Sequence, residues 1–436
     1  MPSHIALAVL LAALAVGVAC RISAPRIVGH LTNVAIVTAV MWPRLYELAM
    51  PPRFALAVLL ALGAVSCALS LAASVPTRTL ISVSVLGFTG VMLVAFLGFQ
   101  VVTAGVGDTY FRYFVVAPLS AAYGYLLVRS GRIAELGYAL LGVAVITSVL
   151  AVTEVVTDGP ILKGNTFDEF IDGQFRSAVF SEQTLVLSAL LLCALTVAIV
   201  ATAGTRRVLF VPVLLAGIAA TFSRGALILA VCYVIVVAVS ARAPGIRRYI
   251  AAVRAPATAF LLLAAPMVLL LVGAMGYGVT SSDPTTASAQ YRRAIYAIMP
   301  ESLRTHPLGW GASGPPEGMY MLRSPFGTLD VSATVDSEVV HVALEYGYFG
   351  LALLAIIVVV VIARVRADRW WSHMALLITA AGLYLSIHSW LSLLSVWAIA
   401  LGAAAANPPR RSSADLTERD SQPIREPSTG LEPVHF

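Results

Sequence analysis

Charged residues are scarce in this chain. They make up 11% of its 436 residues, whereas hydrophobic residues make up 59% and the mean hydropathy is +0.89. Soluble globular domains devote about a quarter of their residues to charge, so the composition excludes an ordinary soluble enzyme. It predicts a membrane protein instead, because only such a chain has use for so many long apolar runs.

Lysine and cysteine are also nearly absent. Lys163 is the only lysine, and the net charge of +6 therefore comes from arginine. Basic patches with interleaved aromatic residues are missing, which argues against a nucleic-acid partner. The four cysteines lie inside apolar runs without metal-ligand spacing, so neither a disulfide framework nor a zinc cluster of cysteines is expected.

The apolar runs predict an all-α polytopic membrane protein of about 12 to 13 transmembrane helices, since about 20 apolar residues cross a bilayer. The predicted spans are residues 5–20, 27–42, 54–74, 79–103, 112–128, 134–157, 181–203, 207–222, 225–241, 256–279, 337–363, 372–389 and 390–406. We expect one transmembrane domain, residues 1–406, with polar extracytoplasmic loops at residues 158–182 and 281–336. Residues 407–436 are rich in Pro, Ser and charge, which predicts a disordered cytoplasmic tail.

The distribution of arginines among the loops predicts the orientation of these spans. Arginines accumulate in alternate loops, for example at Arg206 and Arg207 and within residues 242–254 and 364–369. Arginine-rich loops face the cytoplasm, so residues 281–336 are expected outside. The span count leaves the side of the N-terminus open.

The polar loop at residues 281–336 begins with a predicted surface helix. Apolar residues recur at helical spacing between Tyr291 and Leu303, and Arg292 and Arg293 lie in the N-terminal part of this segment. The helix dipole disfavours positive charge there, which suggests a negative partner. Anionic lipid headgroups and a substrate diphosphate both satisfy this expectation. A turn rich in Gly and Pro follows at residues 307–316.

An acidic stretch ends the loop. If the next helix begins near Ser337, Glu338, His341 and Glu345 share one face at spacings of three and four, and Asp336 lies at about the N-cap. Helix capping by Asp336, a core or interfacial His341 and a hydrogen bond of Glu345 within the helix bundle explain these residues without function. A carboxylate or imidazole near arginines also suits general-base catalysis.

Two further polar segments face the same side. Arg224 lies in a tight turn at residues 221–225, between two apolar runs, where a guanidinium binds either lipid headgroups or a substrate phosphate. The loop at residues 158–182 contains Arg176. We expect the three outward segments to converge on one cavity.

Together these motifs resemble the O-antigen ligase and polysaccharide polymerase (Wzy-type) superfamily. The resemblance covers the second half of the chain and depends on the order of several short motifs. They are Ser-Arg-Gly at residues 223–225, Arg292 with Tyr296, Pro-Leu-Gly-Trp-Gly at residues 307–311, Asp336-Ser, and Glu-Tyr-Gly-Tyr-Phe-Gly at residues 345–350. A weaker likeness covers residues 175–182.

The resemblance implies glycan transfer from a polyprenyl-diphosphate carrier to an acceptor hydroxyl, at the outer face of the bacterial cytoplasmic membrane. It implies that Arg224 and Arg292 bind the diphosphate, with Arg293 as the alternative to Arg292. Asp336 occupies the position where ligases commonly carry histidine, and His341 is the alternative base. Arg176 and Glu345 are the further substrate-binding candidates.

The implied partners are the lipid-linked glycan donor, a glycan or glycolipid acceptor, and membrane lipids. No cofactor is expected, and no metal, because no acidic pair with metal-ligand spacing faces outside. The alternatives are a transporter or permease for a small anion or glycan, and a non-catalytic scaffold. Ionisable residues gather at the outer ends of spans and not at mid-span, which favours the enzyme. The choice between ligase and polymerase stays open.

Overall fold

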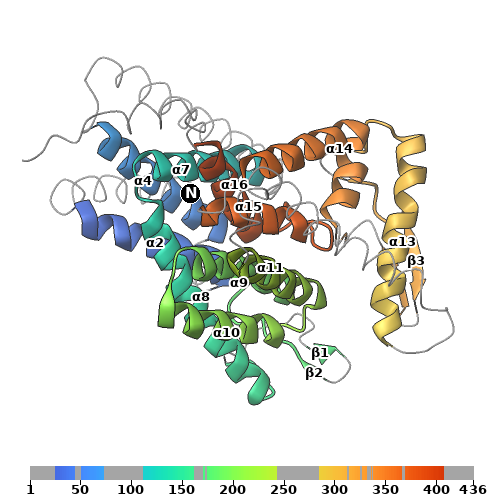
Figure 1. The fold of residues 1–436 in the computed structure, drawn as a ribbon. Helices are drawn as coiled ribbons and strands as arrows, with labels where there is room; N and C mark the ends of the chain where they lie inside the picture. Colours follow the sequence, from blue (N-terminus) through green and yellow to red (C-terminus); the bar gives the residue numbers. More distant parts are fainter. Residues whose placement is uncertain are drawn as a thin grey trace, which may run out of the picture. The chain divides into compact units, whose positions relative to one another are not determined.

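A computed structural model describes residues 25–44, 51–72, 111–161, 170–171, 174–242, 284–311, 314–324, 327–330, 335, 337–365 and 369–406. Within them the chain is almost entirely helical (Figure 1), as the composition predicted. The helices are α2 (Pro25–Met41), α4 (Pro52–Ala72), the π-helix η1 (Arg112–Val116), α7 (Ala117–Arg129), α8 (Ile133–Val156), α9 (Thr184–Val200), α10 (Gly204–Ala220), α11 (Arg224–Arg242), α13 (Pro284–Thr305), α14 (Glu338–Arg364), α15 (Trp370–Ala381) and α16 (Leu391–Ala405).

Most predicted spans within the described ranges coincide with a helix. Two helices there, α8 and α14, are long and apolar enough to cross a membrane, and several shorter apolar helices accompany them. The predicted spans at 5–20, 79–103 and 256–279 and the tail at 407–436 lie outside the described residues. The number of crossings and the sidedness of the loops therefore stay predictions.

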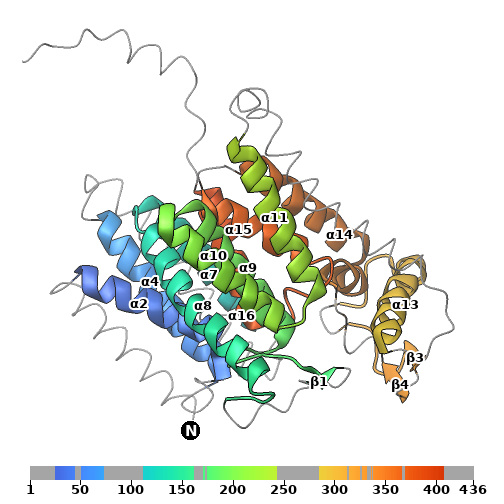
Figure 2. The same cartoon turned by 60° about the horizontal axis from the view of Figure 1, so that its bottom comes forward.

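Helix α9 forms the centre of the packed core. It lies among α8, α10, α11, α15 and α16 (Figure 2), and nearly all of its residues are buried. Its sequence shows no polar stripe because neighbours cover it on every side. Helices α7 and α16 approach backbone to backbone, since a Cβ on Gly124 would meet Ile399 and one on Gly402 would meet Ala121. Close contact through small residues is typical of membrane helices.

The predicted span at residues 372–389 is wrong in its second half. Helix α15 ends at Ala381, and residues 382–390 form a non-helical segment before α16. The amide of Glu338 donates to the carbonyl of Gly382 at 2.8 Å, while the Glu338 carboxylate accepts from the Ile387 amide at 2.6 Å. These bonds satisfy backbone groups that would otherwise continue the helix. We call residues 382–390 the central segment.

The polar loop contains the predicted surface helix and a hairpin that was not predicted. The helix is α13, which is longer than the expected segment and carries Arg292 and Arg293. Strands β3 (Met321–Ser324) and β4 (Gly327–Asp330) pair antiparallel, and the Asp330 carboxylate accepts from the Gly318 amide at 2.6 Å. A second short hairpin, β1 (Phe170–Ile171) with β2 (Gln174–Phe175), lies in the other polar loop.

Candidate functional site

Helix α14 is broken at Gly347. This residue has φ 59° and ψ −145°, a conformation that is accessible almost only to glycine. A Cβ at this position would overlap the carbonyl of Pro307. A Cβ on Gly309, which has φ 77°, would overlap the carbonyl of Glu345. Both glycines are thus required by a close approach of two backbones.

Three backbone hydrogen bonds join the Gly/Pro turn to this break. The amides of Trp310 and Gly311 donate to the carbonyls of Leu344 and Glu345 at 2.8 Å each, and the Tyr348 amide donates to Pro307 at 2.9 Å. Amides of the turn therefore donate hydrogen bonds to carbonyls that the interrupted helix leaves without partners. Two motifs that are separate in the sequence form one structural unit.

The first part of α14 and the central segment bring two histidines and two glutamates together. Nε2 of His341 lies 3.0 Å from Oε1 of Glu345, and Nε2 of His388 lies 3.7 Å from Oε2 of the same carboxylate. The two imidazole rings are 3.9 Å apart, edge to face. We call Glu338, His341, Glu345 and His388 the His/Glu cluster.

Each histidine of the cluster is held at its Nδ1 atom. Nδ1 of His388 lies 2.7 and 2.8 Å from the two oxygens of Glu338. Nδ1 of His341 faces the hydroxyl groups of Ser386 at 3.1 Å and Ser389 at 3.4 Å. Both Nε2 atoms are consequently oriented toward Glu345.

Three of the four residues of the cluster are buried, and His341 is partly exposed. Glu338 and Glu345 are 4% exposed and His388 is 7% exposed. Burial lowers the pKa of His388, but the Glu338 carboxylate and then Glu345 outweigh it, so the net pKa is raised. Oε2 of Glu345 and Nε2 of His388 are buried without a hydrogen-bond partner. The cluster thus favours a positive charge between its carboxylates.

The central segment also contacts three other helices. The Tyr296 hydroxyl of α13 donates to the Leu383 carbonyl at 2.8 Å and lies 3.0 Å from Oγ of Ser337. The Tyr384 ring packs against Gly225 at the start of α11, and the Arg112 guanidinium of η1 donates to the Ser389 carbonyl. Helices α11, α13, α14 and η1 therefore meet at this segment.

Arg176 contacts the turn that precedes Arg224. Arg224 is exposed and begins α11. The Arg176 guanidinium donates to the Thr221 carbonyl at 3.1 Å, and the Ser177 amide donates to Ala220 at 3.2 Å. Phe222 between them has φ 52°, which is uncommon for a bulky residue. Hydrogen bonds thus join the segment that carries Arg176 to the turn that precedes Arg224, and the convergence of the three outward segments on one cavity stays a prediction.

The other predicted site residues lie on α13 and α14 or directly before α14. His341 and Glu345 contact each other as described above. Asp336 lies outside the described residues, and Ser337 is the N-cap of α14, one residue later than expected. Arg292 and Arg293 belong to α13, four and three residues before Tyr296 in the sequence.

Sequence reasoning missed His388, the pairing of Glu338 with it, and Arg112. His388 lies in an apolar run that reads as one span, and its only signal was the Ser-Ile-His-Ser sequence at residues 386–389. Arg112 was only the first residue of the predicted span 112–128; it begins a π-helix, an element that is frequent at functional sites.

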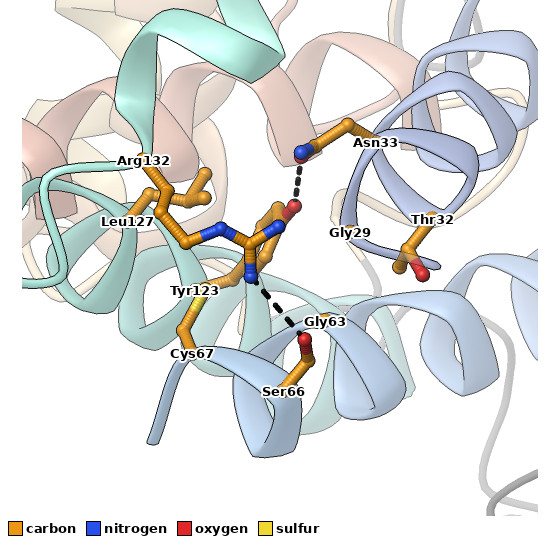
Figure 3. A pocket seen from close by; sticks show the side chains of 9 residues that line it. All are labelled: Gly29, Thr32, Asn33, Gly63, Ser66, Cys67, Tyr123, Leu127 and Arg132. Atoms are coloured by element: carbon orange, nitrogen blue, oxygen red, sulfur yellow. Dashed lines mark hydrogen bonds between the residues drawn. The ribbon is translucent and has the colours of Figure 1, made fainter. Parts of the chain in front are cut away.

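A second polar cluster lies between α2, α4 and α7 (Figure 3). The Arg132 guanidinium pairs with Glu135 at 2.6 Å and reaches Oγ of Ser66 at 3.4 Å. Asn33 donates to Glu135 at 3.2 Å and accepts from the Tyr123 hydroxyl. These groups satisfy one another, so we assign this cluster to helix packing.

Comparison with known proteins gives one match. A family model described as O-antigen ligase matches residues 208–355, about a third of the chain. No curated protein and no solved structure matches the chain. The match includes Arg224, the turn at residues 307–311 and the break in α14, but it ends before the central segment. Proteins of this family are membrane proteins, in agreement with the apolar helices.

Proposed function

Because residues 208–355 belong to the O-antigen ligase family, as the sequence motifs indicated, we propose that this chain transfers a glycan from a polyprenyl-diphosphate carrier to an acceptor hydroxyl. The family supports a ligase- or polymerase-like activity in general terms. The lipid-linked donor, the glycan or glycolipid acceptor and the outer face of a bacterial cytoplasmic membrane are parts of our proposal.

In the proposed reaction the acceptor oxygen forms a bond to the anomeric carbon of the donor glycan, and the bond from that carbon to the diphosphate oxygen breaks. The acceptor proton passes to a base, and the diphosphate leaves with the electron pair. Arg224 and Arg292 stabilise the charge that develops on the diphosphate, with Arg293 as the alternative to Arg292 and Arg176 beside Arg224. Fixed guanidinium groups in a partly dry site supply this stabilisation without a metal ion.

The arrangement around the central segment carries the proposal. This segment packs on Gly225, which follows Arg224, and accepts a hydrogen bond from Tyr296, one helical turn after Arg292. Tyr296 also contacts Ser337, the residue after Asp336. These contacts of Gly225, Tyr296 and Ser337, each a neighbour of a proposed site residue in the sequence, support the proposal.

Asp336 is the base that we favour. Both ring nitrogens of His341 already have partners, Glu345 at Nε2 and the hydroxyls of Ser386 and Ser389 at Nδ1. A histidine held in this way is a poor acceptor for a substrate proton. We assign His341 and Glu345 to positioning the start of α14.

The proposal is tested with Arg224→Ala, Arg292→Ala and Asp336→Ala, each expressed in cells that lack the native protein. We expect each variant to reduce glycan transfer at least about 100-fold, as loss of a transition-state contact does. The product is measured with purified protein and polyprenyl-diphosphate glycan. Arg304→Ala is the matched control, because Arg304 also lies on α13 but is exposed and forms an ion pair with Glu301 at 2.9 Å.

Wild-type glycan transfer by all three variants would exclude the proposed enzyme. A transporter would form no glycan product in a purified system in detergent, because no compartments exist there between which a substrate could move. Product formed there by the wild type, and not by the variants, is explained only by catalysis.

A further inference from the structure

The His/Glu cluster has the composition of a metal site. His341, Glu345 and His388 each direct one ligand atom inward, and these atoms lie within 4.8 Å of one another. Two imidazoles and one carboxylate form a ligand set that proteins use for divalent transition metals, and zinc is the commonest example. Sequence spacing did not reveal this set because His388 comes from a distant segment.

The distance between His388 and Glu345 suits two ligands of one metal ion better than a hydrogen bond between them. Nε2 of His388 and Oε2 of Glu345 are 3.7 Å apart, beyond hydrogen-bond range, and neither atom has another partner. Ligand atoms about 2.0–2.1 Å from a tetrahedral zinc ion are about 3.4 Å apart. The pair therefore needs only a small adjustment to bind one ion.

The atoms behind the ligands also have the arrangement of a metal site. Metal-binding histidines usually direct their second ring nitrogen toward a carboxylate, hydroxyl or carbonyl, which fixes the tautomer and the ring orientation. Here Glu338 holds Nδ1 of His388, and Ser386 and Ser389 hold Nδ1 of His341. Nε2 of His388 is thus left without a hydrogen-bond partner, and Nε2 of His341 faces Glu345, its fellow ligand in the set.

We propose that His341, Glu345 and His388 bind a divalent transition-metal ion of the zinc class, with Glu338 orienting His388. Bound zinc joins the first part of α14 to the central segment. The ion has a positioning role, because two of its ligands come from α14 and the third comes from the central segment. The proposal goes beyond the glycan transfer described above and does not depend on it.

The direct test is zinc binding by the full-length protein in detergent, purified without a polyhistidine tag and stripped with a chelator. Zinc chloride is titrated against a competing chromophoric chelator, and bound metal is counted by elemental analysis. We expect about one Zn²⁺ per chain and a rise in Tm of at least about 3 °C with zinc. Cobalt in place of zinc is expected to give the absorption bands of a low-symmetry nitrogen and oxygen site.

Variants assign the ligands. His388→Gln and Glu345→Gln are expected to lower zinc affinity at least tenfold and to abolish the rise in Tm, and Glu338→Gln is expected to lower affinity about 10- to 100-fold. His306→Gln is the control, because His306 lies outside the cluster and stacks on Trp310. It is expected to bind zinc as the wild type does.

Wild-type protein that binds no zinc more tightly than about 10 μM overturns the proposal whatever the variants do, because three preformed ligands bind zinc more tightly than this. Equal affinity in wild type and His388→Gln overturns it as well. Zinc binding by a protein that fails to transfer glycan supports the site and counts against the proposed function alone.

Discussion

Glu338 is the residue on which most contacts of the cluster depend. Its carboxylate is 4% exposed and accepts from the Ile387 amide while it holds Nδ1 of His388. A buried charge with these partners is costly to disrupt, because removing it leaves a buried imidazole and an amide without an acceptor.

Glu338→Ala is therefore expected to destabilise the protein by about 3 kcal/mol, within the range measured when one partner of a buried pair is removed. The measurement is thermal unfolding in detergent, followed by intrinsic fluorescence. Glu317→Ala is the control, since Glu317 is exposed in the loop before β3, and it is expected to leave Tm unchanged. Equal Tm values for the two variants would show that Glu338 has no structural role.

At the scale of elements, the break in α14 is the feature that shapes the site. It separates a short helical piece that carries the cluster from a long apolar piece that is suited to the membrane. Residues 307–311 hold the break through backbone bonds, so their glycines act through geometry and not through side-chain chemistry.

Gly347→Ala and Gly309→Ala are each expected to lower stability by at least about 2 kcal/mol, because a Cβ in these conformations is strained and meets a carbonyl oxygen. Glycan transfer is expected to fall with them, since α13 is then displaced from α14. Gly142→Ala is the control: a Cβ there meets nothing within 4 Å in helix α8, and alanine favours a helix. Unchanged Tm in both variants would contradict the tight junction.

At the scale of the whole molecule, every candidate site residue is expected on the outer side of the membrane. The arginine distribution carries this prediction, and it places Glu317 outside and Arg206 inside. Both positions are exposed, so a cysteine at either one is open to reagents.

Glu317→Cys and Arg206→Cys, each in a background without the four native cysteines, test the sidedness. A membrane-impermeant maleimide applied to intact spheroplasts is expected to label position 317 and to label position 206 only after lysis. The reversed pattern would place the loop at residues 281–336 in the cytoplasm and exclude the proposed outer-face reaction.

The sequence by itself determined the class of molecule and much of the helical order, because apolar runs and arginine bias are local properties of the chain. It also identified residues 221–225, 307–311 and 345–350, whose turns and glycines leave a local signature. These motifs lie inside the segment that the family match covers.

Only the tertiary structure decided which of these motifs meet. The end of α15 depends on bonds between Glu338 and residues 382–388, which are about 50 positions away, so the apolar run there reads as one span. His388 becomes a candidate ligand for the same reason. His388 lies beside Glu338 and Glu345 only in the folded protein. No local sequence pattern predicts a contact between residues so far apart in the chain.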